Sequence, residues 1–221
     1  ALTQYMTHPE EWTYHIPEGM TTMEGALVEP AAVGMHAAVL GGAQPGKSIV
    51  ILGGGTIGLM VLQACISLGA TDITVVDVIE KRLELAKKLG AARVINGKEE
   101  DTVAVLRSEE MYGDHGVDLV FEAAGAVFTA QQAVQIVSRG GKIMMVGTQS
   151  KPVPIDFLKI NREVTIQTSF RYCNNFPQTI EAISSGRFNV KDMVTNIYDY
   201  EDVQKAFEEA IDPVKKTEMV K

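Results

Sequence analysis

Short apolar runs alternate with helical patterns along the middle of the chain. Residues 48–52, Ser-Ile-Val-Ile-Leu, form an apolar, β-branched run that is too short for a helix and stops at three glycines, so the run predicts a buried strand. Comparable runs predict five further strands, at 73–77, 93–96, 117–121, 142–146 and 164–169. Apolar residues at helical spacing predict the helices between them, at 57–68, 80–89, 99–111 and 128–137.

This alternation predicts an α/β fold with a doubly wound parallel sheet. Because strand–helix–strand crossovers are right-handed, two such halves give a six-stranded Rossmann sheet with strand order 3-2-1-4-5-6. In a sheet of this kind, ligands bind beyond the carboxyl ends of the strands, at the switch point between the first and fourth strands. The loops after these strands are therefore where a site is expected.

The two ends of the chain follow different patterns. The first twenty residues are rich in loop-forming residues, and Thr21-x-x-Glu24 has the form of a capping box that starts a helix at about Thr22. Pro30 is expected to interrupt this helix and to begin a second one over 31–40, which would place Glu29 at a helix break. After the sixth strand, helices at 177–185 and 201–211 and a strand at 217–221 are expected in another structural layer.

Composition and charge argue against some classes of function. The 221 residues include 46% hydrophobic residues, enough for a full core, and 28 acidic against 20 basic residues give a formal charge of −8. This charge argues against a nucleic-acid surface, and no apolar run reaches membrane-spanning length. Cys65 and Cys173 form neither a disulfide framework nor a metal cluster, so a cytoplasmic location is expected.

A glycine turn follows the first strand. Gly53, Gly55 and Gly58 stand in G-x-G-x-x-G spacing, and Asp77 ends the next strand nineteen residues after Gly58. In this context the glycines permit a tight turn, a close approach of a pyrophosphate and close helix packing, while the acid can accept from ribose hydroxyls. A dinucleotide site is therefore predicted. The alternatives are a tight turn that binds nothing, or a methyltransferase-like site, although Ile51-Leu52 occupies the place where that class usually has an acid.

Three further loops are expected to converge on the nicotinamide end of a dinucleotide. They are residues 123–125 after the fourth strand, 147–148 after the fifth and 170–172 after the sixth, so Arg171 and Tyr172 become candidates for polar contacts. Arg82 is either a cation beside the adenosine end of the cofactor or a solvated helix charge. For Glu29 the plain interpretation is an acid that favours a helix N-terminus.

Four stretches together carry a resemblance to a known family. They are Gly25-Ala-Leu-Val-Glu-Pro30, the glycine turn, Asp77 with Arg82, and Phe170-Arg-Tyr-Cys-Asn174. With these the chain resembles the sorbitol (polyol) dehydrogenase-like members of the zinc-dependent medium-chain dehydrogenases. The resemblance implies NAD-dependent oxidation of a secondary hydroxyl of a small-molecule polyol to a ketone, assisted by an active-site zinc.

The resemblance also assigns residues. Glu29, Arg171 and Tyr172 match catalytic or substrate-side positions, and Glu29 would lie near the zinc, through a water or the substrate rather than as a certain ligand. The expected cofactor set is Gly53, Gly55, Thr56, Ile57, Gly58, Asp77, Arg82, Ala124, Gly125, Val146, Gly147, Thr148, Ser169, Phe170 and Arg171. Since Asp77 would face a 2′-phosphate as a like charge, NAD is expected over NADP.

The main zinc ligands of the family lie before the first residue of this sequence. We therefore expect residues 1–28 to be a remnant of a catalytic domain, 29–174 an NAD-binding Rossmann domain and 175–221 the C-terminal part of the catalytic domain. A fragment of this kind should bind NAD weakly and form no NADH above background. Association into a homodimer or homotetramer is expected through the edge strand, 164–170. Other medium-chain alcohol or threonine dehydrogenases, and a non-catalytic dinucleotide-binding or redox-sensing module, stay open as alternatives.

Overall fold

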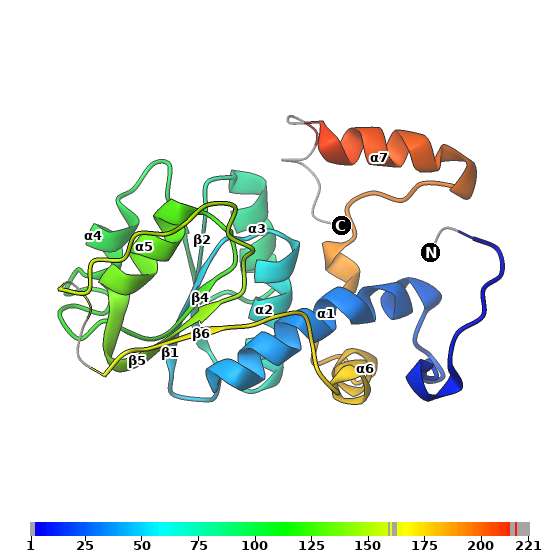
Figure 1. The fold of residues 1–221 in the computed structure, drawn as a ribbon, viewed down its shortest axis with the longest axis horizontal. Coiled ribbons are helices and arrows are strands. Elements are labelled where there is room, and N and C mark those ends of the chain that lie inside the picture. Colours follow the sequence, from blue (N-terminus) through cyan, green and yellow to red (C-terminus); the bar gives the residue numbers. More distant parts are fainter. Residues whose placement is uncertain (1–2, 159, 161–162, 213–214, 216–221) are drawn as a thin grey trace.

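Six parallel strands form a single sheet in the order β3-β2-β1-β4-β5-β6, as expected (Figure 1). The computed structural model describes residues 3–158, 160, 163–212 and 215. The strands are β1 (Ser48–Leu52), β2 (Asp72–Asp77), β3 (Arg93–Asn96), β4 (Val117–Glu122), β5 (Val137–Met145) and β6 (Thr165–Thr168). All five strand pairs are parallel, so the fold class predicted from the alternation is confirmed.

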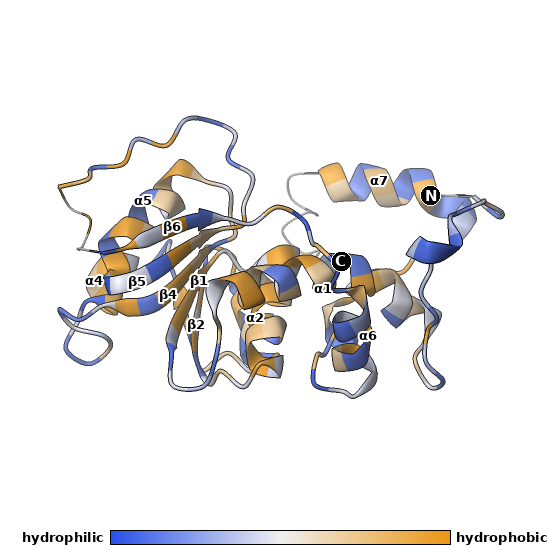
Figure 2. Ribbon diagram, turned by 60° about the horizontal axis from the view of Figure 1, so that its bottom comes forward, coloured by the Kyte–Doolittle hydropathy of each residue, from blue (hydrophilic) through white to orange (hydrophobic). Residues whose placement is uncertain are grey.

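Helices cover both faces of the sheet. Along β1, Ile49 and Ile51 belong to one apolar core and Val50 and Leu52 to the other, because successive side chains point to opposite faces. The first core is closed by α1 (Thr22–Gly41), α2 (Thr56–Ser67), α3 (Glu80–Lys88) and α6 (Phe176–Ser184), and the second by α4 (Thr102–Leu106) and α5 (Val127–Ile136). Figure 2 shows the apolar character of the central strands β1 and β4 between these layers.

The register aligns the carboxyl ends of the central strands. Leu52 at the end of β1 pairs with Val76 of β2 on one side and with Glu122 of β4 on the other. Glu122 pairs in turn with Met145 of β5, and Met145 with Thr168 of β6. The loops that follow these strands therefore start at one edge of the sheet, where a ligand site is expected.

The helix α1 is continuous through Pro30, so the predicted break at Glu29 is wrong. The capping box begins this helix as predicted, with the Glu24 amide donating to Thr21 Oγ1 at 3.2 Å and the Thr21 amide donating to Glu24 Oε2 at 2.8 Å. Pro30 cannot donate to the carbonyl of Ala26, but Ala26 is exposed, so water can satisfy that carbonyl. Burial of Pro30 and its neighbours against the core offsets the lost hydrogen bond.

Two other predicted boundaries differ from the structure. The predicted helix at 99–111 is confined to α4, which the carboxylate of Asp101 caps and which ends before a run of turns. β5 starts at Val137 instead of Lys142, because the β4–β5 register shifts between Val117 and Leu119 and the extra residues fall around Gly140, whose φ is +67°. An irregular strand of this kind has no plain apolar run to reveal it.

The segment after the sheet divides into two parts. α6 packs on α1, and Ile183, Phe188 and Met193 join the core of the first face. Further on, η2 (Lys191–Met193) and η3 (Tyr200–Asp202) lead to α7 (Val203–Ile211), which stands apart from the sheet in Figure 1 and has no buried residue. The predicted strand at 217–221 lies outside the described residues. The domain boundaries at 28/29 and 174/175 stay predictions.

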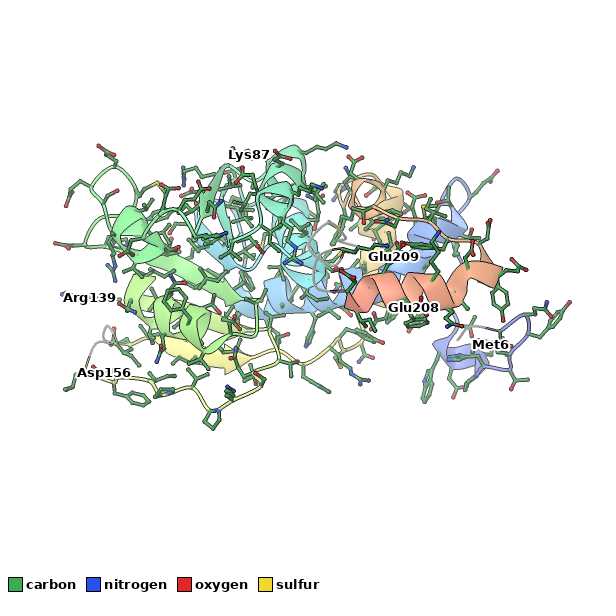
Figure 3. The ribbon with its side chains drawn as sticks, turned by 90° about the horizontal axis from the view of Figure 1, so that it is seen from above. Met6, Lys87, Arg139, Asp156, Glu208 and Glu209 are labelled. Atoms are coloured by element: carbon green, nitrogen blue, oxygen red, sulfur yellow. The ribbon has the colours of Figure 1, made fainter. Side chains whose placement is uncertain are left out.

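The N-terminal segment is exposed, and charged side chains lie on the outer surface. The short helix η1 (Glu10–Trp12) lies in an exposed segment before α1. Charged side chains lie around the periphery, with Lys87, Arg139 and Asp156 pointing outward and Glu208 and Glu209 on α7 (Figure 3). No helix in the described part of the chain has the length and apolar character needed to cross a bilayer. The cytoplasmic location stays a prediction.

Replacing Gly34 in α1 with alanine should destabilise the protein. A Cβ at Gly34 would lie 2.4 Å from the backbone carbonyl carbon of Met60 in α2, and backbone cannot move aside as a side chain can. Overpacking of this kind costs about 1–3 kcal/mol, which exceeds the gain of up to about 1 kcal/mol in helix propensity. We expect Gly34→Ala to lower the midpoint of urea unfolding.

Gly25→Ala is the matched control in the same helix. A Cβ there would meet only the flexible end of the Ile16 side chain, so the gain in helix propensity should appear as a neutral or stabilising effect. Equal stability of the two variants would contradict the close α1–α2 packing.

Candidate functional site

The glycine turn between β1 and α2 is built from close backbone contacts. Gly53 has a φ of +111°, which favours glycine, and a Cβ there would lie 2.8 Å from the amide nitrogen of Ala124. A Cβ at Gly58 would lie 1.8 Å from the carbonyl oxygen of Gly53. Gly55 is the N-cap of α2 and has no side chain to cap it. The turn therefore brings the N-terminus of α2 to the edge of the sheet, a position suited to a phosphate group.

Asp77 ties the end of β2 to this turn. Its Oδ2 accepts a hydrogen bond from the Gly54 amide at 2.7 Å, and its Oδ1 accepts from the amides of Val78 and Ile79 at 2.8 and 2.9 Å. Arg82 on α3 places its Nη1 3.6 Å from Oδ2, and Asp77 is only 9% exposed. The carboxylate is thus held in a fixed orientation beside the turn, where a ribose is expected in this fold.

A cleft of about 410 Å³ opens beside Asp77. This volume lies within the range of roughly 300–1,000 Å³ that is typical of ligand sites. The cleft is lined by Gly53, Gly55, Val76, Asp77, Val78, Arg82, Gly97, Thr102, Ala123, Ala124, Ala126, Phe128, Thr129 and Gln132. Five of the predicted cofactor residues are therefore brought together there, namely Gly53, Gly55, Asp77, Arg82 and Ala124.

The cleft contains a buried polar group whose partner is missing. The hydroxyl of Thr102 is buried and has no hydrogen-bond partner among the described residues, although the side chain lines the cleft. Buried polar groups are rarely left unpaired in proteins, so an unpaired one in a cleft points to a ligand. Together with a turn in which Gly53 and Gly58 leave no room for a Cβ, this observation indicates that the residues present suit a dinucleotide.

The loops after β4 and β5 meet over a second buried acid, Glu122. A Cβ at Gly125 would lie 2.6 Å from the Thr148 carbonyl oxygen, and a Cβ at Gly147 would lie 2.3 Å from the Gly125 amide nitrogen. Val146 and Gly147 both donate backbone hydrogen bonds to the Glu122 carbonyl at 2.8 Å. Residues 123–126 and 146–148 thus form one block beside the glycine turn. Ala123, Ala124 and Ala126 of this block line the cleft, whereas the predicted residues 125 and 146–148 do not.

The predicted residues after β6 lie further out. The Ser169 amide donates to the Met145 carbonyl at 2.9 Å, so Ser169 adjoins the β5 loop, and its buried hydroxyl has no partner among the described residues. Phe170 is 80% exposed, and the guanidinium of Arg171 lies 5.3 Å from the centroid of its ring. Arg171 has a φ of +52°, so the backbone is strained there, as it often is at functional sites.

Among the described residues, the three predicted catalytic residues make no hydrogen bond, ion pair or ring contact with one another. Glu29 is exposed on α1, and Tyr172 packs edge-on against Phe176 with the ring centroids 4.9 Å apart. Phe176 stacks in turn on Tyr14, at a centroid distance of 5.5 Å. Tyr172 is therefore part of an aromatic cluster that joins the start of α6 to the N-terminal segment.

The described residues do not fit a zinc centre. Within 3–158, 160, 163–212 and 215, no three His, Cys, Asp or Glu side chains lie close enough together to hold a metal ion. Cys65 is fully buried, and burial raises the pKa of its thiol far above the usual value, which disfavours the thiolate that a metal needs. We therefore assign no step to a metal bound by these residues.

Sequence reasoning missed several residues of the site, among them the polar residues Thr102, Gln132 and Glu122. Thr102 and Gln132 line the cleft from helices, where a single polar residue carries no pattern of its own. Glu122 did carry a signal, because an acid at the end of an apolar strand before Ala123-Ala-Gly125 repeats the arrangement that singled out Asp77.

Comparison with known proteins places this geometry in a family. The zinc-binding dehydrogenase domain matches residues 56–185. Sorbitol dehydrogenase of Bacillus subtilis is 39% identical over 214 residues, which cover 96% of this chain and 60% of the relative. Among solved structures, an Escherichia coli oxidoreductase/dehydrogenase of unknown specificity, involved in membrane biogenesis, is 62% identical with a TM-score of 0.92, covering 96% of this chain and 60% of that one.

A third similar protein was solved with a nucleotide bound. A Sinorhizobium meliloti protein in complex with NADP is 25% identical with a TM-score of 0.85, covering 90% of this chain and 59% of that one. The chain thus spans about 60% of the length of the relatives it matches. The family match extends over more than half of the chain, from Thr56 at the start of α2, and includes Asp77 and the loops after β4, β5 and β6. The chain therefore belongs to the zinc-binding dehydrogenase family.

Proposed function

We propose that this chain provides the cofactor-binding half of an NAD-dependent dehydrogenase that oxidises a secondary hydroxyl of a polyol to a ketone. The observation that carries the proposal is Asp77, a buried carboxylate fixed between the glycine turn and the end of β2. The polyol class is supported by the similarity to Bacillus subtilis sorbitol dehydrogenase. A bound nicotinamide would supply the hydride acceptor.

Each part of the site has a distinct task in this proposal. Asp77 receives the adenosine ribose, and the N-terminus of α2 receives the pyrophosphate. The block formed by residues 123–126 and 146–148 lies on the other side of the switch point, where it supports the nicotinamide. Ser169, Phe170 and Arg171 extend this side, and Glu29 and Tyr172 stay candidates for the substrate side.

A dinucleotide-binding module without catalysis is the second candidate function. It is favoured by the lack of a group of metal-ligating side chains within the part of the chain that the structure describes. Binding of NAD alone does not separate the two candidates. Turnover separates them when it is measured on a protein that contains this chain together with a set of metal ligands, because only a dehydrogenase converts a polyol.

The 221-residue chain should bind NAD without reducing it. Loss of hydride from an alcohol needs a group that takes the hydroxyl proton, and the described cleft presents neither three metal ligands nor a positioned base. We expect calorimetry to detect NAD binding, and absorbance at 340 nm to show no NADH with zinc and sorbitol. No NAD binding at millimolar concentration would contradict the proposed function, and NADH formation would show a complete catalytic site in this chain.

The site should prefer NAD to NADP by at least about tenfold, or ~1.4 kcal/mol. A 2′-phosphate would lie against the Asp77 carboxylate, whose two oxygens already accept three backbone hydrogen bonds and cannot turn away. Calorimetric titration of both cofactors measures the ratio of their dissociation constants. Equal affinities would show that Asp77 does not face the ribose.

Two variants should move this preference in opposite directions. Asp77→Asn keeps the side-chain shape but removes the like charge, so the ratio of the NADP dissociation constant to the NAD dissociation constant should fall. Arg82→Leu removes the cation 3.6 Å from that carboxylate, so NADP should lose more affinity than NAD and the ratio should rise. The same direction of change in both variants would contradict the electrostatic explanation.

The edge strand β6 should mediate association of two copies of the chain. Its Ile166 is 40% exposed, and a two-fold partner could extend the sheet across this edge. We expect sedimentation at micromolar concentration to show a dimer that Ile166→Lys weakens. Ile197→Lys is the control, since Ile197 is exposed away from β6 and should leave association unchanged.

A further inference from the structure

Glu122 is a fully buried acid whose two oxygens reach different loops. Its Oε1 accepts hydrogen bonds from the amides of Ala124 and Gly125, at 3.0 and 2.9 Å, and from the Thr129 hydroxyl at 2.7 Å. Its Oε2 accepts from the side-chain amide of Gln149 at 2.8 Å. One side chain with 0% exposure thus joins the β4 loop, the first turn of α5 and the β5 loop.

The hydrogen bonds of Glu122 form a bridge between the β4 and β5 loops, and the position of this bridge makes it relevant to the cofactor. Glu122 ends β4 and pairs with Leu52, the last residue of β1, so it lies at the switch point of the sheet. The loop that it holds packs directly on the glycine turn, since a Cβ at Gly53 would lie 2.8 Å from the Ala124 amide nitrogen. Glu122 does not line the cleft, and so it can act on a ligand only through the loops.

We propose that Glu122 is a positioning residue for the nicotinamide half of the cofactor. By fixing Gly125, which does not line the cleft, against the 147–149 loop, it sets the surface on which the nicotinamide side of the site is built, while the adenosine side depends on Asp77. Buried carboxylates are costly unless they are fully hydrogen-bonded, which is the arrangement seen here. This inference rests on the proposed binding of NAD.

The bridge depends on geometry rather than on charge. In Glu122→Gln, the amide oxygen can still accept from Ala124, Gly125 and Thr129. The new NH2 group can donate to Gln149 after the Gln149 amide turns over, because the Oε1 of Gln149 is buried without a partner among the described residues. Glu122→Gln should therefore keep the bridge, whereas Glu122→Ala and Gln149→Leu remove all or part of it.

The test compares binding of NAD with binding of ADP-ribose, which lacks the nicotinamide. We expect Glu122→Ala to weaken the binding of NAD by about tenfold or more, and Gln149→Leu to weaken it by about threefold or more. Both variants should bind ADP-ribose with an affinity within about twofold of that of the unchanged protein. Glu122→Gln should match the unchanged protein with both ligands. If Glu122→Ala does not fold, Gln149→Leu carries the comparison.

Amide hydrogen exchange gives a second readout that needs no ligand. The amides of Ala124 and Gly125 should exchange faster in Glu122→Ala and Gln149→Leu than in Glu122→Gln, because only the last keeps both ends of the bridge. Three outcomes would each overturn the proposal. The first is unchanged amide exchange in Glu122→Ala or in Gln149→Leu, and the second is an equal loss of affinity for NAD and for ADP-ribose. The third is a loss of NAD affinity in Glu122→Gln as large as that in Glu122→Ala. Failure of the unchanged protein to bind either ligand would instead contradict the proposed function.

Discussion

The close approach of backbone at the switch point is the constraint on which the rest of this structure depends. Gly53 lies against the loop after β4, Gly58 against the carbonyl of Gly53, and Gly125 and Gly147 against each other across the β4 and β5 loops. At each contact even one added carbon atom would collide with backbone. Three loops and the N-terminus of a helix are thereby gathered at one edge of the sheet, where Gly53 and Gly55 present backbone to the cleft.

Two buried carboxylates hold this edge in place. Asp77 fastens the glycine turn to the end of β2, and Glu122 fastens the β4 loop to the β5 loop. Each accepts backbone hydrogen bonds that would otherwise be unpaired beside an apolar core. Only Asp77 lines the cleft, so one acid can meet the ligand directly and the other acts through the loops.

The sequence alone predicted those features that local physical rules determine. The strand order followed from right-handed crossovers, and the glycine turn with Asp77 followed from spacing. The predictions were wrong where tertiary packing overrides local preference, as at Pro30 inside α1, or where an irregular register hides a strand, as in β5. Thr102 was missed because its place in the cleft depends on how α4 packs, which a single polar residue does not reveal. Glu122 carried a signal at the end of its strand, but its bridge to Gln149, 27 residues away, depends on the fold.

A crystal structure of this chain with NAD bound tests the central claim most directly. The account predicts the adenosine ribose within hydrogen-bonding distance of the Asp77 carboxylate, the pyrophosphate at the N-terminus of α2, and the nicotinamide beside the block formed by residues 123–126 and 146–148. A dinucleotide bound elsewhere, or bound with its adenosine and nicotinamide ends exchanged across the switch point, would contradict it.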